Sequence, residues 1–130
     1  MSPWDLMQGT LHRAQNMAVG IQNELLDHYP ALGEIVRRLI GTYEPDLIYL
    51  FGSQARGDAG PDSDFDLLVV VPDDASPERR RSRLAYQALR GTATAADILV
   101  CTRSYFDARR HLKASLPGTI LREGRLLHAT

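Results

Sequence analysis

The stretch LFGSQARGDAGPDSDFDLLVVV, residues 50–71, joins two apolar runs through a polar loop. Its second run opens with Asp64 and Asp66, and side chains alternate faces along a strand, so both carboxylates share the face opposite to Phe65. Two carboxylates at the end of a buried strand repel each other and lose hydration, which costs several kcal/mol unless a cation neutralises them. Hard oxygen ligands at close quarters suit Mg²⁺ or Mn²⁺. The stretch therefore predicts a metal site at Asp64 and Asp66.

The polar loop between the two runs has the features of a phosphate-binding turn. Gly52 directly follows the first apolar run, where a glycine permits close backbone approach or an unusual φ angle. Ser53 offers a hydroxyl and a backbone N–H at the point where a short helix begins. Arg56, three residues on, is placed to assist with positive charge. We therefore predict that these three residues bind phosphate beside the carboxylates.

The elements around this stretch predict a small sheet flanked by helices. Strands are expected over 46–51, 64–71 and 96–102, with a last short strand in 125–130. Helices are expected over 5–28, from Pro30 to before Pro45, over 76–90 and 104–115, and in one or two turns of 117–124 closed by Gly124. The order indicates an α/β or α+β domain with a small mixed sheet.

The bulk properties of the chain fit one domain over residues 1–130. We divide it into N-terminal helices (1–44), a core (46–102), and C-terminal helices with a tail (103–130). Hydrophobic residues are 44% of the chain, and no 18-residue apolar stretch or signal pattern occurs, so a cytoplasmic location without membrane contact is expected. The single Cys101 excludes an internal disulfide, and no histidine or cysteine cluster has zinc-ligand spacing.

A cluster of arginines at positions 79, 80, 81 and 83 is the densest positive charge in the sequence. We interpret it as the exposed face of the predicted helix 76–90, because Leu84, Ala88 and Leu89 supply the opposite, apolar face. The net charge is −1. Nucleic acid is therefore not expected as a direct ligand.

Gly52-Ser53, ten intervening residues, and then Asp64-Phe65-Asp66 resemble the nucleotidyltransferase signature of the DNA polymerase β-like superfamily. The stretch is especially similar to the minimal, single-domain branch, and the resemblance is strongest over residues 46–102. It implies a third carboxylate at Asp97, in AADILV. Asp64 and Asp66 would then bind two Mg²⁺ ions that bridge a nucleoside triphosphate, and Asp97 would complete the second metal site and help to activate the acceptor hydroxyl.

The resemblance also implies a function. The minimal branch is commonly encoded with an all-helical HEPN protein, a ribonuclease toxin in many systems. The chain would then be an antitoxin that transfers AMP from ATP onto a tyrosine of that toxin, although no residue pattern distinguishes ATP from other nucleotides. Two alternatives stay open, namely a non-catalytic module that occludes a partner protein, and a small-molecule nucleotidyltransferase resembling the aminoglycoside-modifying enzymes.

Purely structural roles are the alternative for each site residue. Asp64 would cap a strand entrance and Asp66 would form an ordinary ion pair. Asp97 would be one more acid at the start of a strand. Arg56 would be a solvated loop arginine. These interpretations leave the coincidence of the Gly52-Ser53 turn with the two same-face acids unexplained.

Overall fold

The computed structural model describes Leu26 and residues 29–57, 64–92 and 94–130. The predicted helix over 5–28 lies outside the described residues except for Leu26, which is helical. None of the helices in these ranges combines the length and apolar character needed to cross a bilayer.

The described strands form one mixed sheet in the order β3-β2-β1-β4. Strand β2 pairs antiparallel with β1 and parallel with β3, and β4 pairs antiparallel with the other side of β1. The predicted mixed sheet and all four of its predicted strands are confirmed. Their bounds are Leu47–Phe51 (β1), Phe65–Val71 (β2), Ala96–Thr102 (β3) and Arg125–Ala129 (β4).

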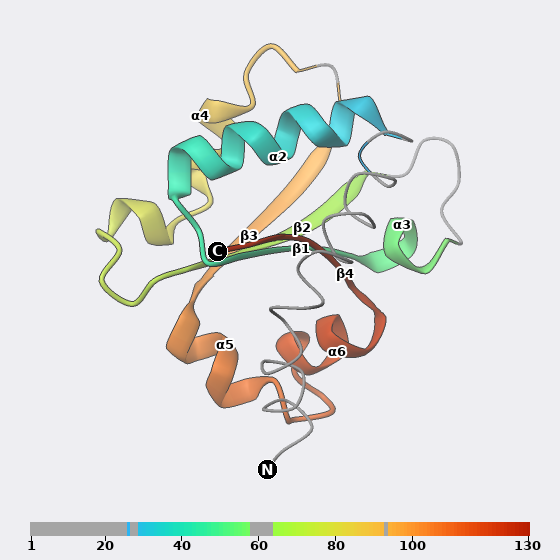
Figure 1. Ribbon diagram of the computed structural model, residues 1–130, viewed down its shortest axis with the longest axis vertical. Coiled ribbons are helices and arrows are strands. Elements are labelled where there is room, and N and C mark those ends of the chain that lie inside the picture. The colour runs from blue at the N-terminus through green and yellow to red at the C-terminus, as the bar shows by residue number, and fades with distance from the viewer. Residues whose placement is uncertain (1–25, 27–28, 58–63, 93) are drawn as a thin grey trace.

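Helices cover both faces of the sheet, which makes a three-layer α/β/α arrangement (Figure 1). Helices α2 and α4 lie on one face, α5 and α6 lie on the other, and the short α3 lies at one end of β1 (Figure 1). The helices are α2 (Pro30–Tyr43), α3 (Gly52–Arg56), α4 (Arg83–Ala88), α5 (Arg103–Arg109) and α6 (Leu116–Glu123), with a 3₁₀ turn at Glu78–Arg80.

Strand β2 is the centre of the core. Its residues Leu67 and Val69 pack with α2 and α4, whereas Leu68 and Val70 pack with Phe106 of α5 and with α6. Because both faces of β2 are buried, its sequence is a continuous apolar run and not an alternating one. The two carboxylates therefore mark the point where the buried part of this strand begins.

Helix α2 has the predicted limits. Pro30 occupies its first turn, where the missing N–H costs nothing, and Glu44 after its last residue takes the left-handed conformation, with φ of 46°. Pro45 then prevents continuation.

The predicted continuous helix over 76–90 is wrong. The chain forms the 3₁₀ turn at Glu78–Arg80, becomes extended at Arg81 and only then forms α4. The buried Tyr43 explains the break, because its hydroxyl donates to the carbonyl of Arg81 and accepts from the amide of Ala85 at 2.9 Å. A helix running through Arg81 would use that carbonyl internally.

The arginine cluster in this segment is not a uniform exposed face. The guanidinium of Arg79 donates to the carbonyl of Tyr43 at 2.6 Å, and Arg80 donates to the carbonyl of Ala75 at 2.9 Å. These two side chains hold the segment against α2 and the end of β2. The exposed-face interpretation is wrong for Arg79, which is half-buried, and holds for Arg80, Arg81 and Arg83, which are exposed.

The predicted helix over 104–115 is also too long. Helix α5 ends at Arg109, and Ser115 belongs to the next helix, since its hydroxyl accepts from the amide of Gly118 at 3.0 Å and caps α6. The predicted end of α6 at Gly124 is confirmed.

Tyr43→Phe should lower the free energy of unfolding by about 1–3 kcal/mol, because it leaves the carbonyl of Arg81 without its partner and removes one of the two acceptors of the Ala85 amide, which keeps the carbonyl of Ser82. Urea unfolding followed by circular dichroism measures this. Tyr86→Phe is the matched control, because the side chain of Tyr86 is exposed. Equal stability of the two variants would contradict the role assigned to the Tyr43 hydroxyl.

Candidate active site

The carboxylates of Asp66 and Asp97 come from neighbouring strands. In the parallel pairing of β2 with β3, Asp66 is the register partner of Asp97, and in the antiparallel pairing of β2 with β1 it is the partner of Phe51. Residues directly paired across strands place their side chains on the same face, about 5 Å apart. The register thus brings two acids together, next to the residue that precedes Gly52.

Asp64 lies immediately before β2 and is exposed. Burial is the main cause that raises the pKa of Asp66 above its ordinary value, and the negative charges of Asp97 and then Asp64 raise it further. The predicted trio is therefore one electrostatic group with Asp66 at its centre.

Gly52 lies directly against the carboxylate of Asp66. Its φ is +73°, and a Cβ at this position would come within 2.5 Å of Oδ2 of Asp66. Only glycine accepts both the conformation and the contact. The backbone therefore turns from β1 into α3 beside the carboxylates, and Ser53 follows, half-buried, as the second residue of α3.

Arg56 is at the last position of α3 and is exposed. Its Nη1 atom lies 3.8 Å from Oε2 of Glu123, at the end of α6. An exposed ion pair at this distance contributes little to stability. Glu123 is a neighbour that the sequence could not reveal, because only the folding of α6 against α3 brings the two residues together.

A divalent cation fits the donors of this group. Carboxylate oxygens are the ligands that Mg²⁺ and Mn²⁺ prefer, and a cation would compete with the proton that the raised pKa of Asp66 favours. Within the described ranges, no three residues among histidine, cysteine, aspartate and glutamate are already gathered closely enough to hold a metal. Carboxylates of like charge repel one another without a counter-ion, so a bound cation would draw these acids closer together.

The sequence of residues 31–127 matches the nucleotidyltransferase domain. The chain belongs to the nucleotidyltransferase family. This confirms the superfamily predicted from the Gly52-Ser53 turn and the Asp64-Phe65-Asp66 pair, and with it the polymerase β-like fold. The curated proteins contain no match to the chain.

A solved structure shares the fold of this nucleotidyltransferase, and another is similar to it at a lower score. One, a toxin–antitoxin with AMP-PNP, is 24% identical with a TM-score of 0.54, and the match covers 75% of this chain and 73% of that one. Another, a mutant of the toxin–antitoxin MntA-HpeT, is 22% identical with a TM-score of 0.48, and the match covers 73% of this chain and 71% of that one.

Gly52→Ala should lower the free energy of unfolding by about 1–2 kcal/mol through its left-handed backbone alone and should also displace the Asp66 carboxylate. We expect at least about a tenfold loss of nucleotide transfer, because small misplacements of reacting groups are costly. Gly57→Ala is the matched control, since Gly57 has φ of +81° with no atom within 4 Å of a Cβ. Thermal unfolding and transfer rates should separate the two variants, and equal transfer by both would contradict the Gly52–Asp66 contact as a constraint.

Asp66→Asn should stabilise the nucleotidyltransferase at neutral pH when divalent ions are absent. The raised pKa means that the ionisation of Asp66 costs more free energy in the folded than in the unfolded state. The free energy of unfolding therefore falls as the pH rises from 3.8, the ordinary pKa, through the pKa in the folded state. The advantage of the asparagine variant should therefore disappear below pH 3.8. Urea unfolding in EDTA across this range tests the effect, with Asp74→Asn, an exposed acid beyond the other end of β2, as the control. A less stable asparagine variant at neutral pH would refute it.

Proposed function

We propose that this nucleotidyltransferase transfers AMP from ATP to a tyrosine hydroxyl of a helical HEPN toxin and thereby acts as its antitoxin. The observation that carries the proposal is the register that pairs Asp66 with Asp97 directly beside Gly52. This register supports the proposal, because the acids that we assign to the metal ions and the turn that we assign to the phosphates lie at one end of the sheet. Two-metal transfer of a phosphoryl group needs both.

Each residue has a role in this proposal. Asp64, Asp66 and Asp97 would hold two Mg²⁺ ions, or Mn²⁺ in their place, and these ions stabilise the attacking and leaving oxygens when bound. The backbone at Gly52 and Ser53 binds the departing β- and γ-phosphates. Arg56 is assigned a supporting role in charge neutralisation, for which it must exchange its contact with Glu123 for one with the phosphates.

The reaction is an in-line displacement at the α-phosphorus of ATP. The acceptor oxygen forms a bond to this phosphorus, the bond from the phosphorus to the bridging oxygen breaks, and pyrophosphate leaves. Asp97 is the group that receives or orients the proton of the acceptor hydroxyl. The exposed position of Asp97 suits this role, because an acceptor from outside the chain can reach it.

ATP and the toxin partner rest on the comparison with the structure that shares the fold. That structure is a toxin–antitoxin that contains AMP-PNP, an analogue of ATP. The matched parts are 75% of this chain and 73% of that one, so the described fold corresponds to most of both chains. The HEPN class and the tyrosine follow from the resemblance to the minimal branch.

Labelling with α-³²P-ATP tests the proposal. The chain is incubated with Mg²⁺ and the helical protein encoded beside it, and we expect label on that partner. Asp66→Asn should reduce the rate by at least about a hundredfold, because it removes a charge that stabilises the transferring phosphate. Asp74→Asn should label the partner at the rate of the unchanged protein.

Three outcomes would contradict the proposal. Transfer that persists in Asp66→Asn would exclude these carboxylates as the metal site. A stable complex that inhibits the partner without any label, with each of the four nucleotides, would favour the occluding module over the enzyme. Label on an aminoglycoside, and not on protein, would favour the small-molecule alternative.

A further inference from the structure

Strand β3 has an open edge. It is the last strand on its side of the sheet, and it pairs only with β2 among the described strands. No described backbone group outside that pairing bonds to residues 96–101. Edge strands expose a row of N–H and C=O groups that can pair with another chain.

The opposite edge of the sheet is protected and the β3 edge is not. Strand β4 is five residues long, carries Arg125 and His128, and has an irregular register against β1 between Ile48 and Tyr49. Charges, bulges and short length are the features by which proteins block edge pairing. Strand β3 has seven residues, an uninterrupted register and a single charge, Asp97. The two edge strands of this sheet thus differ in the features that control whether another strand can pair with them: length, charge and regularity of the register.

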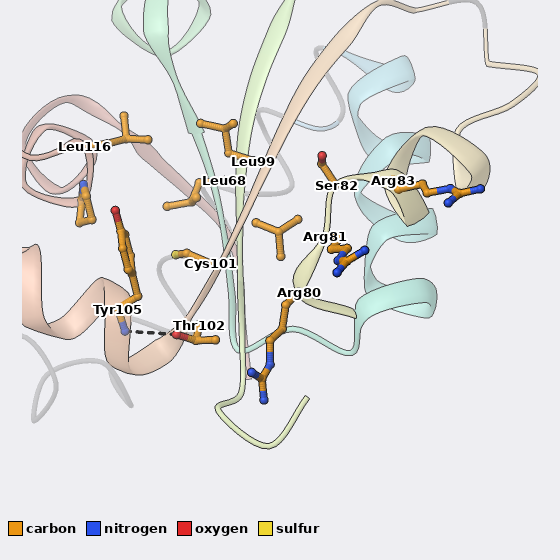
Figure 2. Close-up of a pocket in the computed structure, with 12 residues that line it drawn as sticks. Leu68, Arg80, Arg81, Ser82, Arg83, Leu99, Cys101, Thr102, Tyr105 and Leu116 are labelled. Atoms are coloured by element: carbon orange, nitrogen blue, oxygen red, sulfur yellow. Dashed lines mark hydrogen bonds between the residues drawn. The ribbon is translucent and has the colours of Figure 1, made fainter. Parts of the chain in front are cut away.

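The open edge forms the floor of a groove of about 820 Å³ between two walls (Figure 2). On one side, Leu99 and Cys101 of β3 face Tyr105 of α5 and Leu116 of α6 (Figure 2). On the other side, the segment Arg80–Arg83 lines the groove. An extended segment of another protein lying on β3 would thus contact an apolar wall and a basic wall.

The apolar wall is exposed in this structure. Leu99, Tyr105 and Leu116 are 45%, 48% and 39% exposed, and they are three of the five large hydrophobic side chains that are exposed among the described residues. A fourth, Tyr86, lines a hollow that shares Ser82 and Arg83 with the groove. Such a gathering of exposed apolar side chains is typical of an interaction site.

The basic wall offers charge for an acidic partner. The guanidinium groups of Arg81 and Arg83 make no hydrogen bond or ion pair with a described residue, whereas those of Arg79 and Arg80 bind backbone carbonyls. Arginine is also the basic residue favoured at protein interfaces. Glutamate or aspartate side chains on one face of an added strand could form ion pairs with these two guanidinium groups.

Geometry links the groove to the candidate active site. Leu99 lies two residues after Asp97, on the same face of β3, and that face also carries Asp66 of β2. Neighbouring strands lie about 4.8 Å apart, and directly paired residues share a face. If a strand is added next to β3, its residue opposite Asp97 would continue the row formed by Asp66 and Asp97. The side chain of that residue would lie beside the carboxylate of Asp97.

We propose that the open edge of β3 binds an extended, acidic segment of a protein partner by strand addition, and that this segment places the acceptor hydroxyl opposite Asp97. This inference rests on the proposed function, because it names the surface on which the acceptor of that reaction binds. Hydrogen bonds between the two backbones supply the affinity, and contacts with the two walls determine which side chains of the partner are accepted.

Other occupants fit less well. A second copy paired edge to edge around a two-fold axis would bring two sets of Arg81 and Arg83 into one interface, with like charges opposed. Single-stranded nucleic acid would use the arginines, but it also stacks its bases on aromatic side chains, and Tyr105 is the one aromatic residue among the described residues that line the groove. A protein segment avoids both conflicts.

A pair of synthetic peptides tests the site with the full chain. In the first, valine and glutamate alternate around one central tyrosine, so valine and tyrosine share a face. In the second, lysine replaces glutamate. Amide hydrogen exchange of residues 96–102, followed by mass spectrometry, should slow by about tenfold or more with the glutamate peptide at saturation, and fluorescence anisotropy should show weaker binding of the lysine peptide. The glutamate peptide with N-methyl groups on alternate residues keeps its side chains but cannot pair as a strand, and it should not bind.

Three variants test how the basic wall and the apolar wall each contribute to peptide binding. Arg81→Glu combined with Arg83→Glu should weaken binding of the glutamate peptide by about tenfold and favour the lysine peptide. Arg90→Glu is the matched control, since Arg90 is exposed, lies just after α4 and does not line the groove. Leu99→Lys places a charge on the half-exposed apolar wall and should prevent binding of both peptides.

The outcomes separate this inference from the proposed function. Asp66→Asn should bind the glutamate peptide like the unchanged protein while losing AMP transfer to its tyrosine. Binding with slowed exchange in β3 but without transfer, even in the unchanged protein, supports the docking surface and rejects the enzymatic proposal. The docking surface is overturned if β3 amides are already protected in the protein alone, if neither peptide slows their exchange, if the N-methylated peptide binds equally, or if an oligonucleotide displaces the glutamate peptide.

Discussion

The pairing of β2 with β3 is the constraint on which the candidate site depends. Five consecutive apolar residues of β2, Leu67 to Val71, are almost fully buried between the two helical layers. A slip of one residue would turn each of them to the opposite face, so packing fixes the register strongly. That register also sets Asp66 beside Asp97 and next to the turn at Gly52. The hydrophobic core therefore holds in place two acids whose mutual repulsion would otherwise separate them.

Much of the fold was predictable because local signals and tertiary packing agree. The apolar runs, the prolines around α2, and Gly124 after α6 each act within a few residues of their own position. The prediction of one continuous helix over 76–90 was wrong because the conformation of this segment depends on a residue outside it. Tyr43 belongs to α2, yet its hydroxyl binds both sides of the break at Arg81. A sequence pattern along 76–90 contains no information about that partner.

In the candidate site, too, some features were predictable from the local sequence and others depend on contacts between distant segments. The spacing of Asp64 and Asp66 predicted a shared face, and Gly52 was predicted from its place after a strand. The role of Asp97 came from resemblance, and the structure adds the strand register that makes it the neighbour of Asp66. The contact between Gly52 and the Asp66 carboxylate and the pairing of Arg56 with Glu123 depend on how distant segments meet. Nor does an apolar strand reveal whether it is central or at an edge, so the exposure of Leu99 was not predictable.

Two unfavourable features of this domain, a carboxylate that is disfavoured in its ionised form and an exposed apolar side chain on an edge strand, lie on neighbouring strands. Burial and neighbouring charge disfavour the ionised form of Asp66, while Leu99 of β3 is exposed and the outer edge of β3 pairs with no other described strand. The rest of the sheet has neither defect, since β4 is protected and the remaining core is apolar. Departures from good packing and from neutral charge tend to gather where a protein binds or reacts. Their coincidence along two adjacent strands, at Asp66, Asp97 and Leu99, supports the two proposals together, because the proposed reaction and the proposed partner would then use one surface of this nucleotidyltransferase.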